Sequence, residues 1–187
     1  GMPDAEASAQ AEEYLQKCIE NQDSAGGVVS CKVHGMPAGI GEPVFDKLDA
    51  CLGQAVMSIG AVKAFAVGDG CEVSKKNGST NNDAFCNVNG QISKKTNHAG
   101  GILGGISDGS DIILRAYFKP TPSIYQKQQT VNQAGEEIEI QIKGRHDPIV
   151  VSRAVVVVEA MTAVTILDEL LRNMTSRLDG IKKFYHK

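Results

Sequence analysis

Residues 96–109 read Thr-Asn-His-Ala-Gly-Gly-Ile-Leu-Gly-Gly-Ile-Ser-Asp-Gly, and residues 110–123 read Ser-Asp-Ile-Ile-Leu-Arg-Ala-Tyr-Phe-Lys-Pro-Thr-Pro-Ser. Five glycines crowd the first part, at positions 100, 101, 104, 105 and 109. Residues 112–118 are mostly β-branched, aromatic or long apolar side chains, which predicts a strand. The stretch therefore combines a glycine-rich corner, a strand and a short tail that carries one cation and two hydroxyls.

Two interpretations of this stretch are open. Glycine permits φ > 0 and lets a ligand approach the main chain, and successive amides of such turns can bind an anion. Lys119, with the hydroxyls of Thr121 and Ser123, could then hold a phosphate group. The alternative is a tight β-corner followed by a surface lysine, and the stretch alone does not decide between them.

The length, composition, net charge and cysteine count restrict the class of protein. A length of 187 residues fits one domain over residues 1–187, and 42% hydrophobic residues supply a core. The net charge of −3, without a basic block, argues against nucleic acid and membrane surfaces as partners. The sequence contains no apolar run of about 20 residues, so no transmembrane helix is predicted. The acidic start predicts no signal peptide, and five cysteines without C-x-x-C spacing favour a reduced, cytoplasmic setting.

Outward from the central stretch, the pattern predicts an α+β fold of antiparallel sheet with helices packed outside. We expect an N-terminal helix and linker over 1–25 and a core over 26–187. Within the core we expect strands over 27–34 and 61–67, joined by a helix that begins at Pro43 and Val44 and ends at Gly60. Residues 71–95 are polar and rich in turn residues, which indicates a long, partly mobile loop.

The last third of the chain predicts a hairpin and a long helix. Polar and apolar residues alternate over 130–133 and 137–143, around Asn-Gln-Ala-Gly. Residues 149–178 have helical apolar spacing, although Val155 to Val158 are poor helix formers. Either the helix begins only near Arg153, or these valines lie in a buried segment where packing overrides propensity.

Arg145, His146 and Asp147 form a charged turn before Pro148. The arginine could bind a phosphate or carboxylate, and the aspartate could move a proton. The alternative is a helix-entry turn in which Asp147 caps the following helix. No P-loop, dinucleotide fingerprint, nucleophile elbow or metal-ligand spacing is present in the sequence.

The chain resembles the C-terminal half of chorismate synthases. The resemblance is carried by motifs that run in family order along nearly the whole chain, at residues 23–27, 39–50, 57–63, 68–70, 78–83, 96–107, 119–123, 144–148 and 153–155. It implies a layered α+β fold with helices outside paired antiparallel sheets, and a homotetramer. It also implies that 5-enolpyruvylshikimate-3-phosphate loses its 3-phosphate and a C6 hydrogen to give chorismate. Reduced FMN assists without net redox change, lending an electron transiently.

The same resemblance implies site residues. The positions that fall where the family contacts FMN are Gly60, Ala61, Gly104, Lys119, Pro120, Thr121, Pro122, Ser123 and Arg145. Arg145 would also lie close to the substrate, and Asp147 matches the carboxylate near the flavin N5, a proton-transfer group. Among these site positions, Gly60 replaces a frequent Asn and Pro122 interrupts the hydroxyl run. Outside them, Ala64, Ala66 and Cys71 also depart from the family.

The resemblance places the family's two catalytic histidines, its substrate-binding arginines and the rest of the flavin pocket in the other half of the family's chain. His98 and His146 do not match those histidines. We therefore expect no turnover by this chain alone. It could be a cut piece of a normal enzyme, or Met2 could begin a truncated product. A non-catalytic flavin- or phosphate-binding remnant, or a self-associating one, remains the alternative function.

Overall fold

The computed structural model describes residues 2–144 and 146–185. Its helices, with 3-10 helices marked η, are α1 (Ala5–Glu20), η1 (Val44–Asp46), α2 (Leu48–Met57), η2 (Gly70–Lys75), α3 (Gly78–Asn81), α4 (Val151–Asn173) and α5 (Leu178–Tyr185). Its strands are β1 (Gly27–Val33), β2 (Val62–Val67), β3 (Phe85–Val88), β4 (Gln91–Lys94), β5 (Ile102–Leu103), β6 (Ile106–Ser107), β7 (Ile112–Phe118), β8 (Gln128–Val131) and β9 (Glu137–Ile140).

The central element is β7, the strand predicted from the Ile112–Phe118 run. It lies between β1 and β2 and pairs antiparallel with both. Successive side chains of a strand point to opposite faces, and in β7 every second residue, from Ile112 to Phe118, is buried. Because β1 and β2 both run against β7, they are parallel to each other, and α2 forms part of the connection between them.

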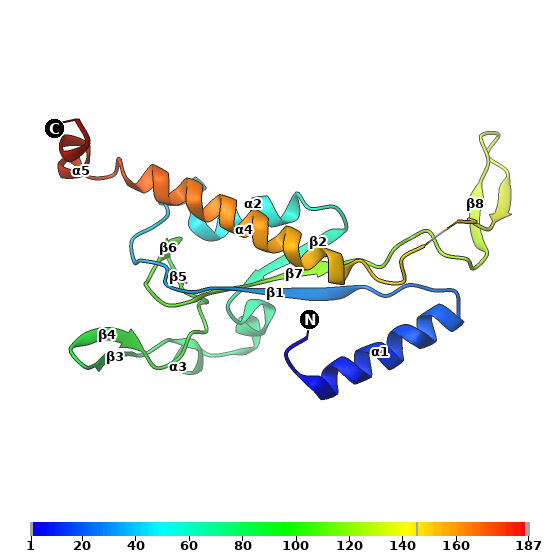
Figure 1. Ribbon diagram of the computed structural model, residues 1–187, viewed down its shortest axis with the longest axis horizontal. Coiled ribbons are helices and arrows are strands. Elements are labelled where there is room, and N and C mark those ends of the chain that lie inside the picture. Colours follow the sequence, from blue (N-terminus) through cyan, green and yellow to red (C-terminus); the bar gives the residue numbers. More distant parts are fainter. Residues whose placement is uncertain (1, 145, 186–187) are drawn as a thin grey trace.

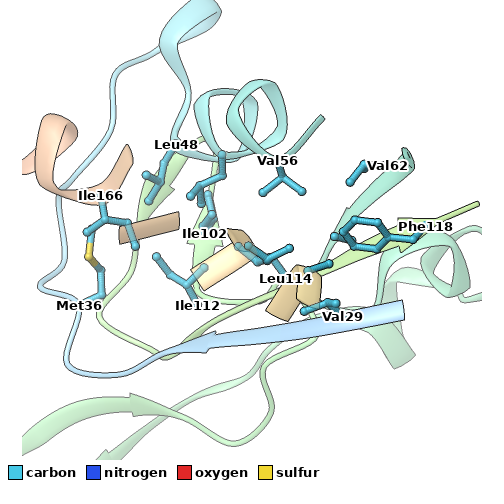
Figure 2. Packing of buried hydrophobic residues seen from close by; sticks show 14 of the residues in the cluster. Val29, Met36, Leu48, Val56, Val62, Ile102, Ile112, Leu114, Phe118 and Ile166 are labelled. Atoms are coloured by element: carbon cyan, nitrogen blue, oxygen red, sulfur yellow. The ribbon is translucent and has the colours of Figure 1, made fainter. Parts of the chain in front are cut away.

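Two helices cover one face of this sheet. In Figure 1, α2 and α4 lie on the same side of β1, β7 and β2, and α4 contacts β1 while α2 contacts β2 and α4. The core lies between these layers. Figure 2 shows Leu48 and Val56 of α2 facing Leu114 and Phe118 of β7, with Ile166 nearby. Helices segregated on one face of an antiparallel sheet confirm the predicted α+β class.

The remaining strands form three small hairpins, β3–β4, β5–β6 and β8–β9. The β5–β6 hairpin contributes Ile102 to the core. The β8–β9 pair confirms the hairpin predicted around Asn132 to Gly135. Figure 1 shows β8 and the β3–β4 pair at opposite ends of the long axis.

The connection from β1 to β2 differs from the prediction. The helix expected to start at Val44 begins only at Leu48, after the short η1. Val44 has φ +70°, in the left-handed region, and Lys47 is extended, so neither can continue an α-helix into Leu48. Likewise β2 begins at Val62 rather than at Ala61, because Ala61 has φ +71°.

Two further expectations need correction. Residues 71–95, expected as a long loop, contain η2, α3 and the β3–β4 hairpin; their mobility stays a prediction. The long helix begins at Val151, not near Arg153, and Val155, Val156 and Val157 are exposed rather than buried. The helical conformation there is set by Ala154 and Val158, which pack into the core.

Candidate functional site

The C-terminal end of β7 brings together two of the predicted site segments. The Lys119 amide donates to the Ala61 carbonyl oxygen at 2.9 Å, so the Gly60–Ala61 pair lies directly beside the start of the Lys119–Ser123 tail. Ala61 holds a left-handed conformation that costs a non-glycine residue about 1–2 kcal/mol. The strained residue thus presents its carbonyl to the chain that leaves the sheet.

The Lys119–Ser123 tail is anchored through its backbone, not through its side chains. Ser24 Oγ donates to the Thr121 carbonyl at 2.7 Å. Lys119, Pro120 and Pro122 are exposed. The Thr121 hydroxyl is buried and has no hydrogen-bond partner in the described part of the chain. A buried hydroxyl without a partner is costly, so it favours a donor or acceptor from a bound group at this point.

Asp147 reaches the same end of the molecule along a different route. The Ala25 amide donates to the Pro148 carbonyl at 2.8 Å, which ties the turn before α4 to the start of β1. Asp147 Oδ2 accepts from Arg153 Nη1 at 2.9 Å, and Arg153 lies in the first turn of α4. The helix N-cap is Val150, without a side-chain cap, so the capping role considered for Asp147 is wrong. Arg145 lies outside the described residues.

A small cavity connects these parts. Its volume is about 80 Å³, and its lining includes Ser24, Ser123, Tyr125, His146 and Asp147. The rings of Tyr125 and His146 meet edge to face at 4.8 Å between centroids. Pockets that enclose a cofactor-sized ligand measure about 300–1,000 Å³, so this cavity does not enclose a flavin. A flavin held here would lie largely on the open surface.

Gly104 is separated from this end. It lies in the β5–β6 turn with φ +61°, next to Gly105, whose carbonyl accepts from the Leu48 amide at the start of α2. Gly60 follows the other end of α2. The ten residues of α2 measure about 15 Å. The structure therefore brings Gly60, Ala61 and the Lys119 tail together and leaves Gly104 at the opposite end of β7.

The glycine run forms a closed backbone corner at that opposite end. The Gly68 amide donates to the Ile113 carbonyl, and the Ile113 amide donates to the Gly100 carbonyl. A Cβ on Gly68 or Gly100 would overlap the backbone of the other segment. The amides of Gly68, Gly100 and Gly101 are thus engaged with the protein, which supports the β-corner interpretation for this part of the glycine run.

A buried ionic group holds this corner. Lys94 Nζ lies 2.6 Å from Asp108 Oδ2 and 3.5 Å from Asp83 Oδ2, and the three side chains are almost fully buried. Asp83 also accepts from the His98 amide at 2.7 Å, the Ala99 amide at 3.0 Å and the Thr96 hydroxyl at 2.7 Å. Burial alone would raise the pKa of Asp83, but these hydrogen bonds and Lys94 lower it to about 2.

Among the described residues, no group of three or more His, Cys, Asp or Glu side chains is arranged to hold a metal ion. No described helix is long and apolar enough to cross a membrane.

Comparisons with known proteins decide the family. The model of the chorismate synthase family matches residues 1–171. The chain belongs to the chorismate synthase family. A chorismate synthase of Lachnoclostridium phytofermentans is 63% identical over all 187 residues, and one of Agathobacter rectalis is 59% identical over 186. A crystal structure of a chorismate synthase matches 97% of the chain with a TM-score of 0.76 at 27% identity.

The chain spans about half the length of these chorismate synthases: 51% of the two bacterial relatives and 48% of the crystallised chain.

Two contacts of the site are not predicted by the sequence. The Ser24 bond to Thr121 joins residues 97 positions apart, and its only sequence signal is that both lie in family motifs. Arg153, the partner of Asp147, also lies in such a motif, but the motif does not predict its ion pair with Asp147. Neither pairing has a periodicity or spacing that would reveal it.

Proposed function

We propose that this chain supplies part of a chorismate synthase site. Together with the rest of a family chain, it would act on 5-enolpyruvylshikimate-3-phosphate and eliminate phosphate to give chorismate, with reduced FMN as cofactor. The observation that carries this is the convergence of Ala61, the Lys119–Ser123 tail and Asp147 on one end of the sheet. These segments are distant in sequence, and each falls where the family resemblance implies flavin contacts.

The residues at this end fit the phosphate of FMN. Lys119 is an exposed cation at the end of a strand, and a phosphate accepts charge-assisted hydrogen bonds from such a group. The partnerless Thr121 hydroxyl and the half-buried Ser123 add donors on the same tail. Pro120 and Pro122 restrict the backbone between them, so the donors are held in place before a ligand arrives. Arg145 would add a second cation.

The chemistry that FMN supplies when bound is transient electron donation to the substrate. Asp147 is the group of this chain to which we assign proton transfer, at the flavin N5. Its Oδ2 pairs with Arg153, which leaves Oδ1 for the exchange of a proton. The pair also ties Asp147 to the first turn of α4, so the carboxylate is positioned by a helix that packs into the core.

We also propose a homo-oligomer in the cytoplasm. In such an oligomer, Gly104, which lies at the other end of α2 from Gly60, would be available to a flavin held by another copy. All five cysteines are free thiols in the described structure, which supports a reducing compartment.

The test is an anaerobic assay with reduced FMN and 5-enolpyruvylshikimate-3-phosphate, which follows phosphate and chorismate. The chain is measured alone and after mixing with the unmatched part of the L. phytofermentans relative. We expect no turnover alone, turnover in the mixture, and loss of that turnover with Asp147→Asn. Turnover that survives Asp147→Asn would contradict the role of Asp147. Turnover by the chain alone would show that its own residues suffice.

A further inference from the structure

The segment that leads from α1 into β1 contacts both parts of the proposed site. The Ser24 hydroxyl donates to the Thr121 carbonyl oxygen at 2.7 Å, in the tail that follows β7. The next residue, Ala25, donates its amide to the Pro148 carbonyl oxygen at 2.8 Å, in the turn that carries Asp147. In Figure 1 the chain before β1 runs beside the chain that leaves β7 and the chain that enters α4. Neighbouring residues of one segment therefore hold the tail and the turn.

The two glycines that follow repeat this alternation. A Cβ added to Gly26 would lie 2.6 Å from the Phe118 carbonyl oxygen, where the tail begins. A Cβ added to Gly27 would lie 2.9 Å from Cγ2 of Val151, the first residue of α4. Glycine permits backbone to approach its neighbours this closely. We call residues 24–27 the spacer, because they set the separation between the tail and the first turn of α4.

Few hydrogen bonds hold the Lys119–Ser123 tail. Its two prolines have no backbone N–H to donate. Within the part of the chain that the structure describes, two hydrogen bonds tie the tail to segments distant in sequence. The Lys119 amide binds the Ala61 carbonyl at the beginning of the tail, and Ser24 binds the Thr121 carbonyl in its middle. Of these two bonds, only the second comes from a side chain, so a single substitution removes it.

Thr121 is the residue on which the Ser24 bond acts. It precedes Pro122, and a residue before proline is restricted to extended conformations. The bond from Ser24 to its carbonyl fixes the orientation of the peptide plane. The Thr121 hydroxyl is buried and has no hydrogen-bond partner among the described residues. Ser24 therefore acts, through the Thr121 backbone, on a hydroxyl that is open to a bound group.

We propose that Ser24 is a positioning residue for the phosphate of FMN. It holds the Lys119–Ser123 tail in the conformation that receives the phosphate and, through the spacer, at one separation from Asp147. This inference rests on the proposed function. Without the Ser24 hydroxyl, the Thr121 carbonyl loses its partner and the tail is less ordered before a ligand arrives. Part of the binding free energy must then order the tail, which weakens the affinity.

The proposal separates the phosphate from the rest of the flavin. Riboflavin has the ring system and the ribityl chain of FMN but carries no phosphate. Because Ser24 acts on the tail that receives the phosphate, removing its hydroxyl should weaken FMN binding and leave riboflavin binding nearly unchanged. A substitution that only lowers the stability of the fold would weaken both ligands alike. The ratio of the two affinities is therefore a measurement that a purely structural role does not change.

The experiment measures ligand affinity and backbone order in the same variants. Flavin fluorescence quenching gives the dissociation constants of FMN and riboflavin, and hydrogen–deuterium exchange follows a peptide over residues 119–127 without ligand. With Ser24→Ala we expect FMN binding to weaken about fivefold, riboflavin binding to change by less than about twofold, and the peptide to exchange faster. Ser24→Thr keeps a hydroxyl and should bind FMN within about twofold of the parent chain.

The matched control is Ser107→Ala. The Ser107 hydroxyl also donates to a carbonyl oxygen distant in sequence, that of Pro37 at 2.6 Å, and Ser107 is buried. It lies in β6, away from the Lys119–Ser123 tail. Its substitution should lower the free energy of unfolding but leave the ratio of the FMN and riboflavin affinities unchanged, together with exchange over residues 119–127. Circular dichroism verifies that each variant stays folded.

Unchanged exchange over residues 119–127 in Ser24→Ala would overturn the inference, and weaker FMN binding at the same time would make Ser24 a direct phosphate ligand. Equal weakening of FMN and riboflavin, or no recovery in Ser24→Thr, would also overturn it. The expected variant effects without lyase activity in the mixture with the unmatched part would leave the role of Ser24 standing and contradict the proposed function. A parent chain that binds neither flavin would contradict the flavin site of the proposed function, and exchange would then decide alone whether Ser24 holds the tail.

Discussion

The two ends of β7 belong to one continuous stretch of sequence but differ in almost every physical property. At the Ile112 end, glycines 68, 100 and 101 let backbone segments touch, and Asp83 and Lys94 are buried in a closed polar group. At the Phe118 end, Lys119 is exposed and the Thr121 hydroxyl lacks a partner among the described residues. Glycines pack closely at both ends, since a Cβ on Gly26 would also overlap the Phe118 carbonyl. The ends therefore differ in whether their polar side chains are paired and buried or open.

The largest expected effect tests whether the glycine end is structural. Gly100→Ala should lower the free energy of unfolding by about 4 kcal/mol, because the residue has φ +66° and its Cβ would overlap Gly68. Gly104→Ala is the matched control, since it has φ +61° but nothing within 4 Å, and should cost about 1 kcal/mol. Urea unfolding followed by circular dichroism measures both. Equal losses would mean that close packing does not explain the glycine corner.

The next effect concerns the buried carboxylate. Asp83→Asn should cost about 3 kcal/mol, because it leaves Lys94 with only Asp108 in a buried position. Asp147→Asn at the open end should cost less than about 1 kcal/mol, since its ion pair is exposed.

Acid should lower the free energy of unfolding by protonating the same carboxylate, Asp83. Because folding lowers the pKa of Asp83 from 3.8 to about 2, its stabilisation is complete above about pH 4 and is lost as the pH falls toward 2. The loss should reach about 2 kcal/mol. Unfolding measured from pH 5 to 2 should therefore decline less steeply in Asp83→Asn than in the parent chain. Parallel curves would contradict the role of Asp83.

A smaller effect should appear in binding and not in stability. Lys119→Ala should weaken FMN binding by about tenfold, through loss of a charge-assisted hydrogen bond to the phosphate. Its free energy of unfolding should stay within about 0.5 kcal/mol of the parent value. The control is Lys95→Ala, an exposed lysine at the closed end. Flavin fluorescence quenching measures the affinity, and equal effects of the two variants would show only nonspecific attraction.

The smallest effect concerns Ala61, the strained residue beside the Lys119–Ser123 tail. Ala61→Gly should raise the free energy of unfolding by about 0.5–1 kcal/mol, because glycine adopts φ +71° without a Cβ penalty. Thermal unfolding measures it. A loss of stability would show that the alanine methyl group packs usefully enough to outweigh the strain.

Periodic elements were predictable from the sequence because their signal is local. The alternation in β7, the helical spacing of α1 and the turn residues of the β8–β9 hairpin each lie within about a dozen residues. The start of α2 was not predictable, since the left-handed conformation of Val44 violates the preference of a β-branched residue and only the surrounding structure maintains it. The short elements of residues 71–95 carry too little apolar periodicity to be recognised.

The candidate site shows the same division. The sequence by itself determined the family, the central strand and the chemistry available on the Lys119–Ser123 tail, because these depend on residue types and their order. Only the tertiary structure decided that Ala61 and Asp147 join this tail, that Gly104 does not, and that the outer face of α4 is exposed. The physical reason is that strand pairing and helix packing bring together residues whose separation along the chain carries no local signal.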